Sequence, residues 1–443
     1  MRRLESRCGE ALAVADAVER ELQPGEHAFT YLGRTARRRL TVDPAGGARR
    51  LLLQQGRFDG YVRLTRDGHE LYLNAPALTA DWAGRLLEAG RPLLPLATSR
   101  VPVAHQTLHR GGWRNRAGQV GLEEVAADPA PLLSRLAEGA GPDHTVQALT
   151  VSEVLSEQVY ADSAGPRGES VCRGIEVQAV VAAGDGRPAA TLSRQAADLE
   201  RVDAVALGRE LALTAAALGP ATETPTGHEI DFLPSAAAQL LRALVTTVLF
   251  NPITEPRPLC TAVIDDGRAV DGYSARAFDC EGTPTSAMEL VTRQGEQRTV
   301  ATRLNSIAGT VRTAHRLTGH AVWEARRYQP RPAATNVRLA PGGAAPDLWS
   351  GERRIVTEVR SLGVEEFRSG GQLAFRLLAV RAVDGTPVGA YAPLVVEGEA
   401  AGFLAALTGV GETVSYYPGP FSVGGAPLSM DLSHLSARNE VRS

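Results

Sequence analysis

Hydrophobic and polar positions alternate along much of the chain with the two-residue period of β-strands. This period puts successive side chains on opposite faces of a strand, so such runs predict strands with one buried face. The first half holds alternating runs at residues 27–42, 49–55, 61–64, 71–73, 145–150, 153–160 and 175–182. The second half holds them at 229–232, 371–382 and 388–397. Turn-forming residues separate most of these runs, which is typical of antiparallel sheets.

Six other segments repeat their apolar residues with the spacing of an α-helix. They are residues 10–22, 79–87, 131–137, 204–218, 235–250 and 400–407. The segment 235–250, SAAAQLLRALVTTVLF, is apolar on nearly all sides and follows Pro234, and Ser235 is the expected N-cap. A helix with so little polar surface is usually buried, so we expect it in the core of the protein.

The order of strands and helices predicts an α+β fold with largely antiparallel or mixed sheets and flanking helices. A chain of 443 residues is too long for one ordinary hydrophobic core. The polar stretch 219–227, GPATETPTG, is the best candidate for a linker. We therefore predict an N-terminal α+β domain at 1–224 and a C-terminal, strand-rich domain at 225–443.

Charge and composition exclude several classes of function. The formal net charge of −3 gives no general attraction for nucleic acid or an anionic membrane. The sequence contains no lysine, which excludes a Schiff base to pyridoxal phosphate and a P-loop. No apolar run approaches the ~20 residues of a membrane span. Cys8, Cys172, Cys260 and Cys280 are widely spaced, which favours a reducing, cytoplasmic environment.

Three histidine features are candidate metal sites, and each is better explained without a metal. His105 and His109 have helical i,i+4 spacing, but Gln106 stands where a zinc peptidase has its glutamate. His228 has no second histidine at the required offset. His315 and His320 lie about 140° apart on an ideal helix. The residues alone therefore support a soluble two-domain α+β protein and no catalytic constellation.

The order of segments resembles the TldD/PmbA family of metallopeptidase-related proteins. The similarity is carried mainly by AVIDDGRAVDGYSARAFDCEGTPT (262–285), TGHA (318–321), PRPAATNVRLAPG (330–342) and the hairpin at 367–389. In the first half, the hairpin after 56–68 and the helix at 203–218 match in placement. The resemblance thus covers most of the chain, and it implies the family's α+β fold.

The resemblance also implies a role without catalysis. Catalytic members carry H-E-x-x-x-H on the central helix and a late cysteine, which together hold a metal, most commonly zinc. In this sequence those helix positions fall on Arg242, Ala243 and Thr247, and the late segment 415–427 has no cysteine. We therefore expect no metal or other cofactor on this chain, and zinc in a catalytic partner subunit.

The leading hypothesis is a PmbA/TldE-like, non-catalytic subunit of a peptidase assembly. It would pair with a TldD-like catalytic subunit, or with an identical chain, and would shape a cavity for an extended peptide. The candidate cavity residues are Arg242, His315, His320 and Arg331.

Two alternatives from other classes remain open at this stage. One is a stand-alone homodimeric hydrolase or tailoring enzyme of a specialised-metabolite pathway, such as that of an antibiotic or modified peptide. Its site would lie around His315, His320 and Arg331. The other is a protein that binds a peptide or small molecule without turnover.

Overall fold

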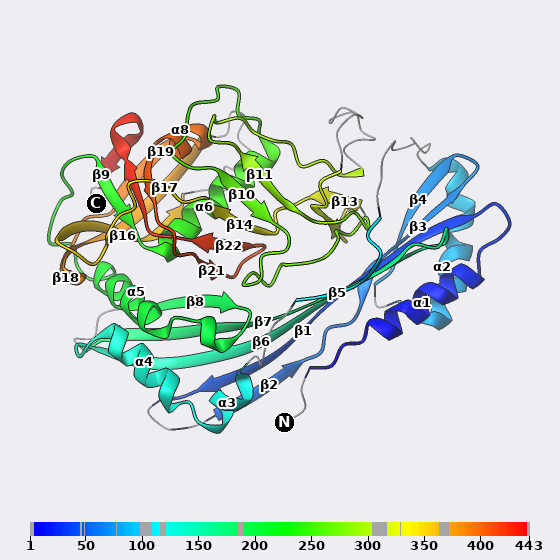
Figure 1. The fold of residues 1–443 in the computed structure, drawn as a ribbon, viewed down its shortest axis with the longest axis horizontal. Coiled ribbons are helices and arrows are strands. Elements are labelled where there is room, and N and C mark those ends of the chain that lie inside the picture. The colour runs from blue at the N-terminus through cyan, green and yellow to red at the C-terminus, as the bar shows by residue number, and fades with distance from the viewer. Residues whose placement is uncertain are drawn as a thin grey trace.

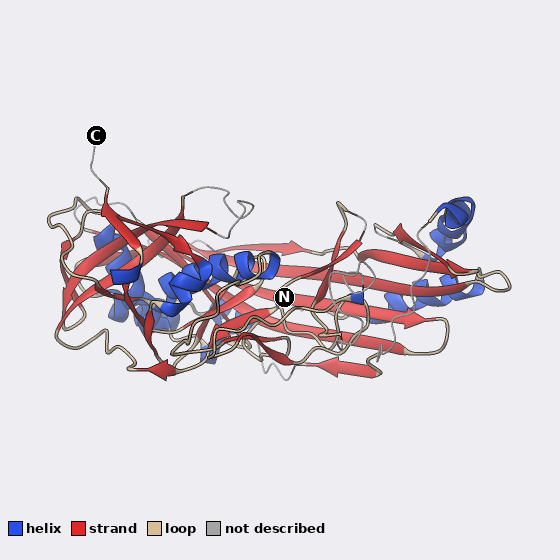
Figure 2. Ribbon diagram, turned by 90° about the horizontal axis from the view of Figure 1, so that it is seen from above, coloured by secondary structure: helices blue, strands red, loops and turns tan. Residues whose placement is uncertain are grey.

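The structure is a computed structural model of the chain. It describes residues 4–44, 47, 49–76, 78–97, 108–115, 121–184, 189–303, 317–327, 329–362 and 372–440. Figure 1 shows an elongated molecule in which long strands run from an end rich in strands and helices to a narrower end that carries β3, β4, α1 and α2. The same elongation is seen from above (Figure 2).

A sheet of 13 strands extends through most of the molecule and is antiparallel apart from two parallel pairs, β14 with β22 and β5 with β7. Its strands, in spatial order, are β11 (Ala287–Val291), β10 (Val263–Asp266), β14 (Asn336–Leu339), β22 (Ser422–Gly425), β21 (Ser415–Tyr417), β8 (Ala190–Ala196), β7 (Arg167–Ala183), β6 (His144–Asp162), β1 (His27–Val42), β3 (Asp59–Arg66) and β4 (His69–Asn74). Beside this path, β2 (Arg49–Gln54) pairs with β1, and β5 (Gly111–Arg114) pairs with β7.

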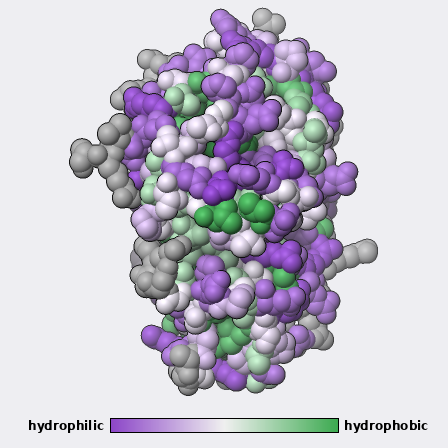
Figure 3. All heavy atoms as spheres, turned by 90° about the vertical axis from the view of Figure 1, so that its left-hand side faces the viewer, coloured by the Kyte–Doolittle hydropathy of each residue, from purple (hydrophilic) through white to green (hydrophobic). Residues whose placement is uncertain are grey.

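A second sheet of nine strands builds the end of the molecule that contains the C-terminus (Figure 1). Its strands, in spatial order, are β15 (Gly342–Gly343), β20 (Leu407–Val410), β23 (Leu428–Asp431), β9 (Glu229–Phe232), β16 (Glu352–Ser361), β17 (Gln372–Val383), β19 (Leu394–Glu399) and β24 (Ser436–Asn439), and β18 (Thr386–Ala390) pairs with β17. A separate hairpin is formed by β12 (Ala321–Glu324) and β13 (Gln329–Pro332). The outer surface of this end is largely polar, with small apolar patches (Figure 3).

Helices cover the sheets and fill the space between them. The α-helices are α1 (Cys8–Arg20), α2 (Ala83–Gly90), α3 (Leu122–Ala127), α4 (Ala130–Ala140), α5 (Ala204–Ala217), α6 (Pro234–Phe250) and α8 (Ala400–Ala405). Short 3-10 helices lie at Ala80–Trp82, Arg91–Leu96, Leu199–Arg201 and Leu432–His434. Among the described residues no helix combines the length and the apolar character needed to cross a membrane.

The helix α5 belongs to two hydrophobic cores at once. Leu207 and Leu211 pack in the core under the N-terminal part of the long sheet, whereas Leu213 and Ala217 pack in the core around α6. The long sheet also crosses the predicted linker, because Tyr416 of β21 pairs with Gln195 of β8. The two parts of the chain therefore share a sheet and a helix, and the boundary at 224/225 remains a prediction. The predicted α+β class is confirmed.

The central helix α6 lies within the C-terminal core, as its composition predicted. It packs against β16 on one side and β22 on another, and most of its side chains are buried. The expected N-cap is wrong, because the helix begins one residue earlier, with Pro234 at its first position. The backbone N–H of Ser235 donates instead to Glu210 Oε2 of α5, at 3.2 Å. A carboxylate from another helix thus serves the N-terminus of α6, where negative charge is favoured.

Candidate functional site

One face of α6 opens into a cavity of about 430 Å³, which we call the α6 pocket. The other walls come from the β12–β13 hairpin and the two residues that follow it, from β16 and β17, and from residues 420–421. The lining residues are Gln239, Arg242, Ala243, Thr246, Leu249, Phe250, Val322, Arg331, Ala333, Ala334, Val359, Ser361, Phe375, Pro420 and Phe421. Its volume is within the range of about 300–1,000 Å³ that is common for small-molecule sites.

The helical period explains which residues of α6 reach this pocket. Gln239, Arg242, Ala243 and Thr246 follow the i, i+3, i+4, i+7 spacing that places side chains on one helix face. Leu240, Leu241, Leu244, Val245 and Val248 occupy the rest of the helix and are buried in the core. The pocket side of α6 therefore carries Gln239, Arg242 and Thr246, and Arg242 is the one charged residue of the helix.

Arg242 is held in place by main-chain carbonyls. Its Nη2 donates to Pro418 O at 2.9 Å and approaches Tyr417 O at 3.3 Å. Gly419 permits this approach, because a Cβ there would lie 2.7 Å from the Arg242 Cζ atom. The guanidinium is thus fixed against the segment that precedes β22.

The charge of Arg242 has no acidic counterpart among the residues that the structure describes. Its Nε is buried without a hydrogen-bond partner, and it forms no ion pair in that part of the chain. Burial lowers the pKa of its guanidinium, against the opposing influence of the Tyr273 hydroxyl. Because an arginine does not lose its proton in a protein, this desolvation leaves a fixed and uncompensated positive charge.

Arg331 brings a second positive charge to the same pocket from β13. Its side chain is 41% exposed, and its Nε lies 3.1 Å from Glu324 Oε2 on the neighbouring strand. This arginine is therefore partly neutralised and more accessible than Arg242. The structure brings together the two arginines that the sequence named as cavity candidates.

The other polar groups of the wall are engaged in holding it together. Gln239 Oε1 accepts the N–H of Val359 at 2.6 Å, which ties α6 to β16. Thr246 Oγ1 donates to Arg242 O at 2.9 Å, within the helix. The guanidinium groups are consequently the strongest available donors for a bound molecule.

The three degenerate metal-motif positions do not converge on this pocket. Arg242 and Ala243 line it, whereas Thr247 is buried on another side of α6 and donates to Ala243 O at 3.0 Å. Thr247 borders a smaller cavity of about 250 Å³ at the C-terminal end of the helix, together with Asn251 and Glu399. Arg242 and Thr247 are five positions apart, about 140° around an α-helix, so these two side chains face different sides.

His320 lies outside the pocket and is completely buried. Its Nδ1 is 2.7 Å from Thr318 O, and its Nε2 is 3.6 Å from Asp265 Oδ2. Burial lowers the pKa of this imidazole, while Asp265 acts in the opposite direction. Asp265 is itself held by the N–H groups of Thr335 and Asn336, at 3.0 and 2.9 Å. This arrangement joins β10 to β14 and gives His320 a structural setting.

The sequence also singles out His105, His109 and His315. His315 and His105 lie outside the described residues. His109 packs its ring against Phe278, with a centroid distance of 5.5 Å, and burial lowers the pKa of its imidazole.

The residues at the expected metal site do not fit a zinc ion. Zinc is held by thiolate, imidazole or carboxylate ligands, and here the three helix positions supply a guanidinium, a methyl group and a hydroxyl group. The cation of Arg242 would repel the ion, and the late segment 415–427 supplies no cysteine. In the described part of the chain, no group of three or more His, Cys, Asp or Glu side chains could hold a metal.

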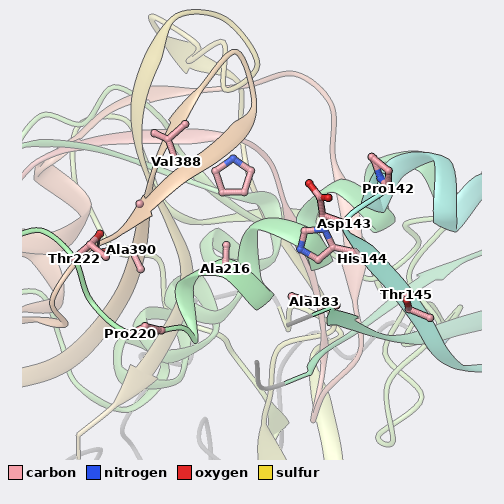
Figure 4. A pocket seen from close by; sticks show the side chains of 13 residues that line it. Pro142, Asp143, His144, Thr145, Ala183, Ala216, Pro220, Thr222, Val388 and Ala390 are labelled. Atoms are coloured by element: carbon pink, nitrogen blue, oxygen red, sulfur yellow. Dashed lines mark hydrogen bonds between the residues drawn. The ribbon is translucent and has the colours of Figure 1, made fainter. Parts of the chain in front are cut away.

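A cavity of about 660 Å³ lies between the turn before β6, the end of α5 and β18. Asp143 and His144 lie next to each other on one side of it, and Thr222 and Val388 lie on the other side (Figure 4). A larger depression of about 910 Å³ is bordered by Glu229, Asp231 and Glu352. Both of these cavities are lined by acidic side chains. The described lining of the α6 pocket contains no carboxylate, which distinguishes it from the other two.

The apolar walls of the α6 pocket were missed by reasoning from the sequence. Val322, Phe375 and Phe421 come from three distant segments that only the fold brings together. Phe421 carried one usable signal, because it lies in the late segment 415–427 that the family resemblance had marked.

The whole fold is shared with solved structures. A proposed modulator of DNA gyrase from Thermotoga maritima has a TM-score of 0.69 at 16% identity, over 95% of this chain and 97% of that one. TldE from Thermococcus kodakarensis has a TM-score of 0.69 at 14% identity, over 96% and 98%. A proposed modulator of DNA gyrase from Bacteroides thetaiotaomicron has a TM-score of 0.69 at 13% identity, over 97% and 98%. At these identities the likeness shows the fold.

Sequence comparison supports the same relationship over the C-terminal part. Residues 260–432 match the family model described as the PmbA/TldA metallopeptidase C-terminal domain. A search of curated proteins finds no match. The matched domain is that of a metallopeptidase-related family. Residues 260–432 therefore carry a domain of the TldD/PmbA family, and the chain as a whole has the fold seen in TldE.

Proposed function

We propose that this chain is a PmbA/TldE-like subunit of a peptidase assembly and that it contributes a cavity wall but no metal-based catalysis. One observation carries the proposal: the central helix is intact and buried, yet its pocket face presents Arg242 where a catalytic relative would need a metal ligand. Zinc and the hydrolytic water then belong to a TldD-like partner.

The contact between α6 and the late segment supports this assignment. By the family resemblance, catalytic members place ligands on the central helix and near the C-terminus. In this chain the corresponding parts touch, because Arg242 donates to Pro418 O at 2.9 Å. Arg242, held by main-chain carbonyls, therefore lies between the two segments that supply the metal ligands in catalytic members of the family.

The shape of the α6 pocket supports a role in holding substrate. Its walls combine aromatic and aliphatic side chains with two arginines, which is the composition of a site that fixes the orientation of a largely apolar ligand. A peptide or peptide-like substrate would meet this surface at the junction with the partner subunit.

The alternative of a stand-alone hydrolase is less well supported by the described residues. Its suggested site combined His315, His320 and Arg331, but His320 is fully buried and does not line the pocket of Arg331.

Co-purification with candidate partners tests the proposal. The tag-free chain, a TldD-like protein from the same genome and their mixture are assayed for hydrolysis of a mixed peptide library. We expect a stable complex, activity in the mixture and no activity of this chain alone. Hydrolysis by the isolated chain that is abolished by a chelator, with no complex formed, would overturn the proposal.

A further inference from the structure

The lining of the α6 pocket has a marked imbalance of charge. Arg242 and Arg331 are its charged side chains, and the described lining contains no aspartate or glutamate. Glu324 compensates Arg331 from outside the lining, so Arg242 is the cation without a counterion in this part of the chain. A half-buried charge of this kind is costly unless a bound anion completes it.

The geometry of Arg242 leaves part of its guanidinium free for such an anion. Nη2 is occupied by the carbonyls of Tyr417 and Pro418, whereas Nη1 makes no hydrogen bond with the described residues. The carbonyl contacts also fix the plane of the group before a ligand arrives, which reduces the entropy lost on binding. Hydrogen bonds from a guanidinium to a carboxylate are among the strongest that proteins form.

The surroundings of the arginine define what else the ligand carries. Phe375, Phe421 and Val359 line the pocket, and Leu249 and Phe250 extend its apolar surface along α6. The best match is a molecule with one carboxylate next to an apolar side group. A cavity of about 430 Å³ has room for the end of a peptide.

We propose that the α6 pocket binds the free α-carboxylate of a peptide C-terminus whose last side chain is apolar, with Arg242 as the anchoring cation. This inference deepens the proposed function, because it rests on a peptide as the substrate. It assigns to this chain the recognition of the substrate's C-terminal end, while bond cleavage belongs to the partner. Arg331, at the more open side, adds a second and weaker attraction.

Binding of a fluorescein-labelled hexapeptide ending in phenylalanine, measured by fluorescence anisotropy, tests the inference on the full chain. The same peptide with a C-terminal amide, and one with an internal aspartate and a C-terminal amide, are the matched ligands. We expect the free acid to bind at least ~10-fold more tightly than either amide, because hydrogen bonds to a charged group are stronger than those between neutral groups.

Single substitutions test which arginine causes the preference for the free acid. Arg242→Gln should abolish the preference for the acid, and Arg331→Gln should reduce it by a smaller factor. Arg257→Gln is the control, since Arg257 is 60% exposed and lies outside the lining. If Arg242→Gln lowers the thermal stability, Thr246→Phe tests the same point, because it fills the pocket and leaves the guanidinium in place.

Three results would overturn the inference: equal affinity for acid and amides, no saturable binding of the acid by the folded wild-type chain, or an acid preference that survives in both Arg242→Gln and Thr246→Phe. Tighter binding of the internal aspartate than of the free C-terminus would also count against it. These results are separable from failure of the proposed function. A chain that never forms a complex can still prefer the acid, and an active complex can lack this preference.

Discussion

Glu281 is a carboxyl group buried entirely inside the protein, next to a second buried carboxyl group, Asp279. Its Oε2 accepts the N–H of Arg303 at 2.7 Å. Burial raises the pKa of Glu281, and the charge of Asp279 raises it further, although Arg303 and Arg63 act in the opposite direction. Asp279 also has a raised pKa because of burial, even though its Oδ1 accepts the N–H groups of Glu281 and Thr283.

A raised carboxyl pKa has a definite consequence for stability. The folded state retains the proton of Glu281 to a higher pH than the unfolded state, whose ordinary glutamate pKa is about 4.3. The free energy of unfolding therefore falls as the pH rises above that value towards the folded-state pKa. In Glu281→Gln this loss should be smaller, because the amide keeps an acceptor for Arg303 and does not ionise.

Urea unfolding at pH 5 and pH 8 measures this effect. We compare the free energies of unfolding of Glu281→Gln and wild type. From pH 5 to pH 8 we expect their difference to shift in favour of the variant by about 1 kcal/mol or more. Glu289→Gln, at a site where the carboxylate is 43% exposed, should show no such change. Parallel pH dependence of wild type and Glu281→Gln would contradict the explanation.

At the scale of elements, α4 and α5 approach so closely that two glycines are required at their contact. A Cβ on Gly208 of α5 would lie 2.2 Å from Leu136 O of α4, and one on Gly139 would lie 2.0 Å from Val205 O. Backbone atoms cannot move aside as a flexible side chain can. The two helices can therefore pack this closely over the core under the long sheet only when both positions are glycine.

Gly208→Ala should accordingly destabilise the protein by about 1–3 kcal/mol, although alanine favours a helix by about 1 kcal/mol. Thermal and urea unfolding measure the change. Gly9→Ala in α1 is the matched control, because a Cβ there meets nothing within 4 Å and the variant should be neutral or slightly stabilised. A Gly208→Ala variant as stable as Gly9→Ala would show that the helices separate at little cost.

Periodicity predicted the helices well and the strands less completely. The segments 204–218 and 235–250 appear as α5 (Ala204–Ala217) and α6 (Pro234–Phe250), because their apolar faces are long and bounded by Pro or Gly. The predicted strands 145–150 and 153–160 are one continuous strand, β6 (His144–Asp162). Ser152 lies between the two predicted segments and is buried in the middle of the sheet, where it pairs with Arg39 and Glu176. Because serine is polar, the alternating pattern did not indicate that the strand continues through this position.

At the scale of the whole molecule, a buried polar network joins the two halves of the chain. Glu210 of α5 pairs with Arg194 of β8, accepts from the Tyr417 hydroxyl at 3.1 Å and receives the N–H of Ser235. Glu210 and its three partners come from four elements on both sides of the predicted linker. All four groups are buried or nearly so, so the network is poorly screened by water.

Glu210→Gln should lower the free energy of unfolding by about 3–5 kcal/mol, because it leaves the Arg194 charge buried without its partner. Chemical unfolding followed by circular dichroism measures the loss. Arg201→Gln is the control, since its ion pair with Asp271 also links the two halves but is half exposed, and it should cost at most about 1 kcal/mol. Equal losses in the two variants would contradict a special role for the buried network.

The candidate site shows where prediction from sequence ends. The sequence singles out both Arg242 and Arg331, the first by its position on the central helix and the second by its place in a family-like segment. That they share one pocket follows from the fold, which places α6, β13, β16 and residues 420–421 around the same cavity. Hydrophobic periodicity identifies the faces of single elements, but it carries no information about which faces meet. The aromatic walls of the pocket therefore could not be predicted from hydrophobic periodicity.

The metal content of the purified, tag-free protein tests most directly whether this scaffold has lost the ion of its catalytic relatives. Inductively coupled plasma mass spectrometry is applied to this chain alone, after dialysis against zinc-containing buffer and desalting, and to its complex with a TldD-like partner. We predict far less than one zinc per isolated chain and about one per heterodimer. One tightly held zinc per isolated chain, in the wild-type protein with Arg242 unchanged, would contradict the claim that this chain has lost its metal site.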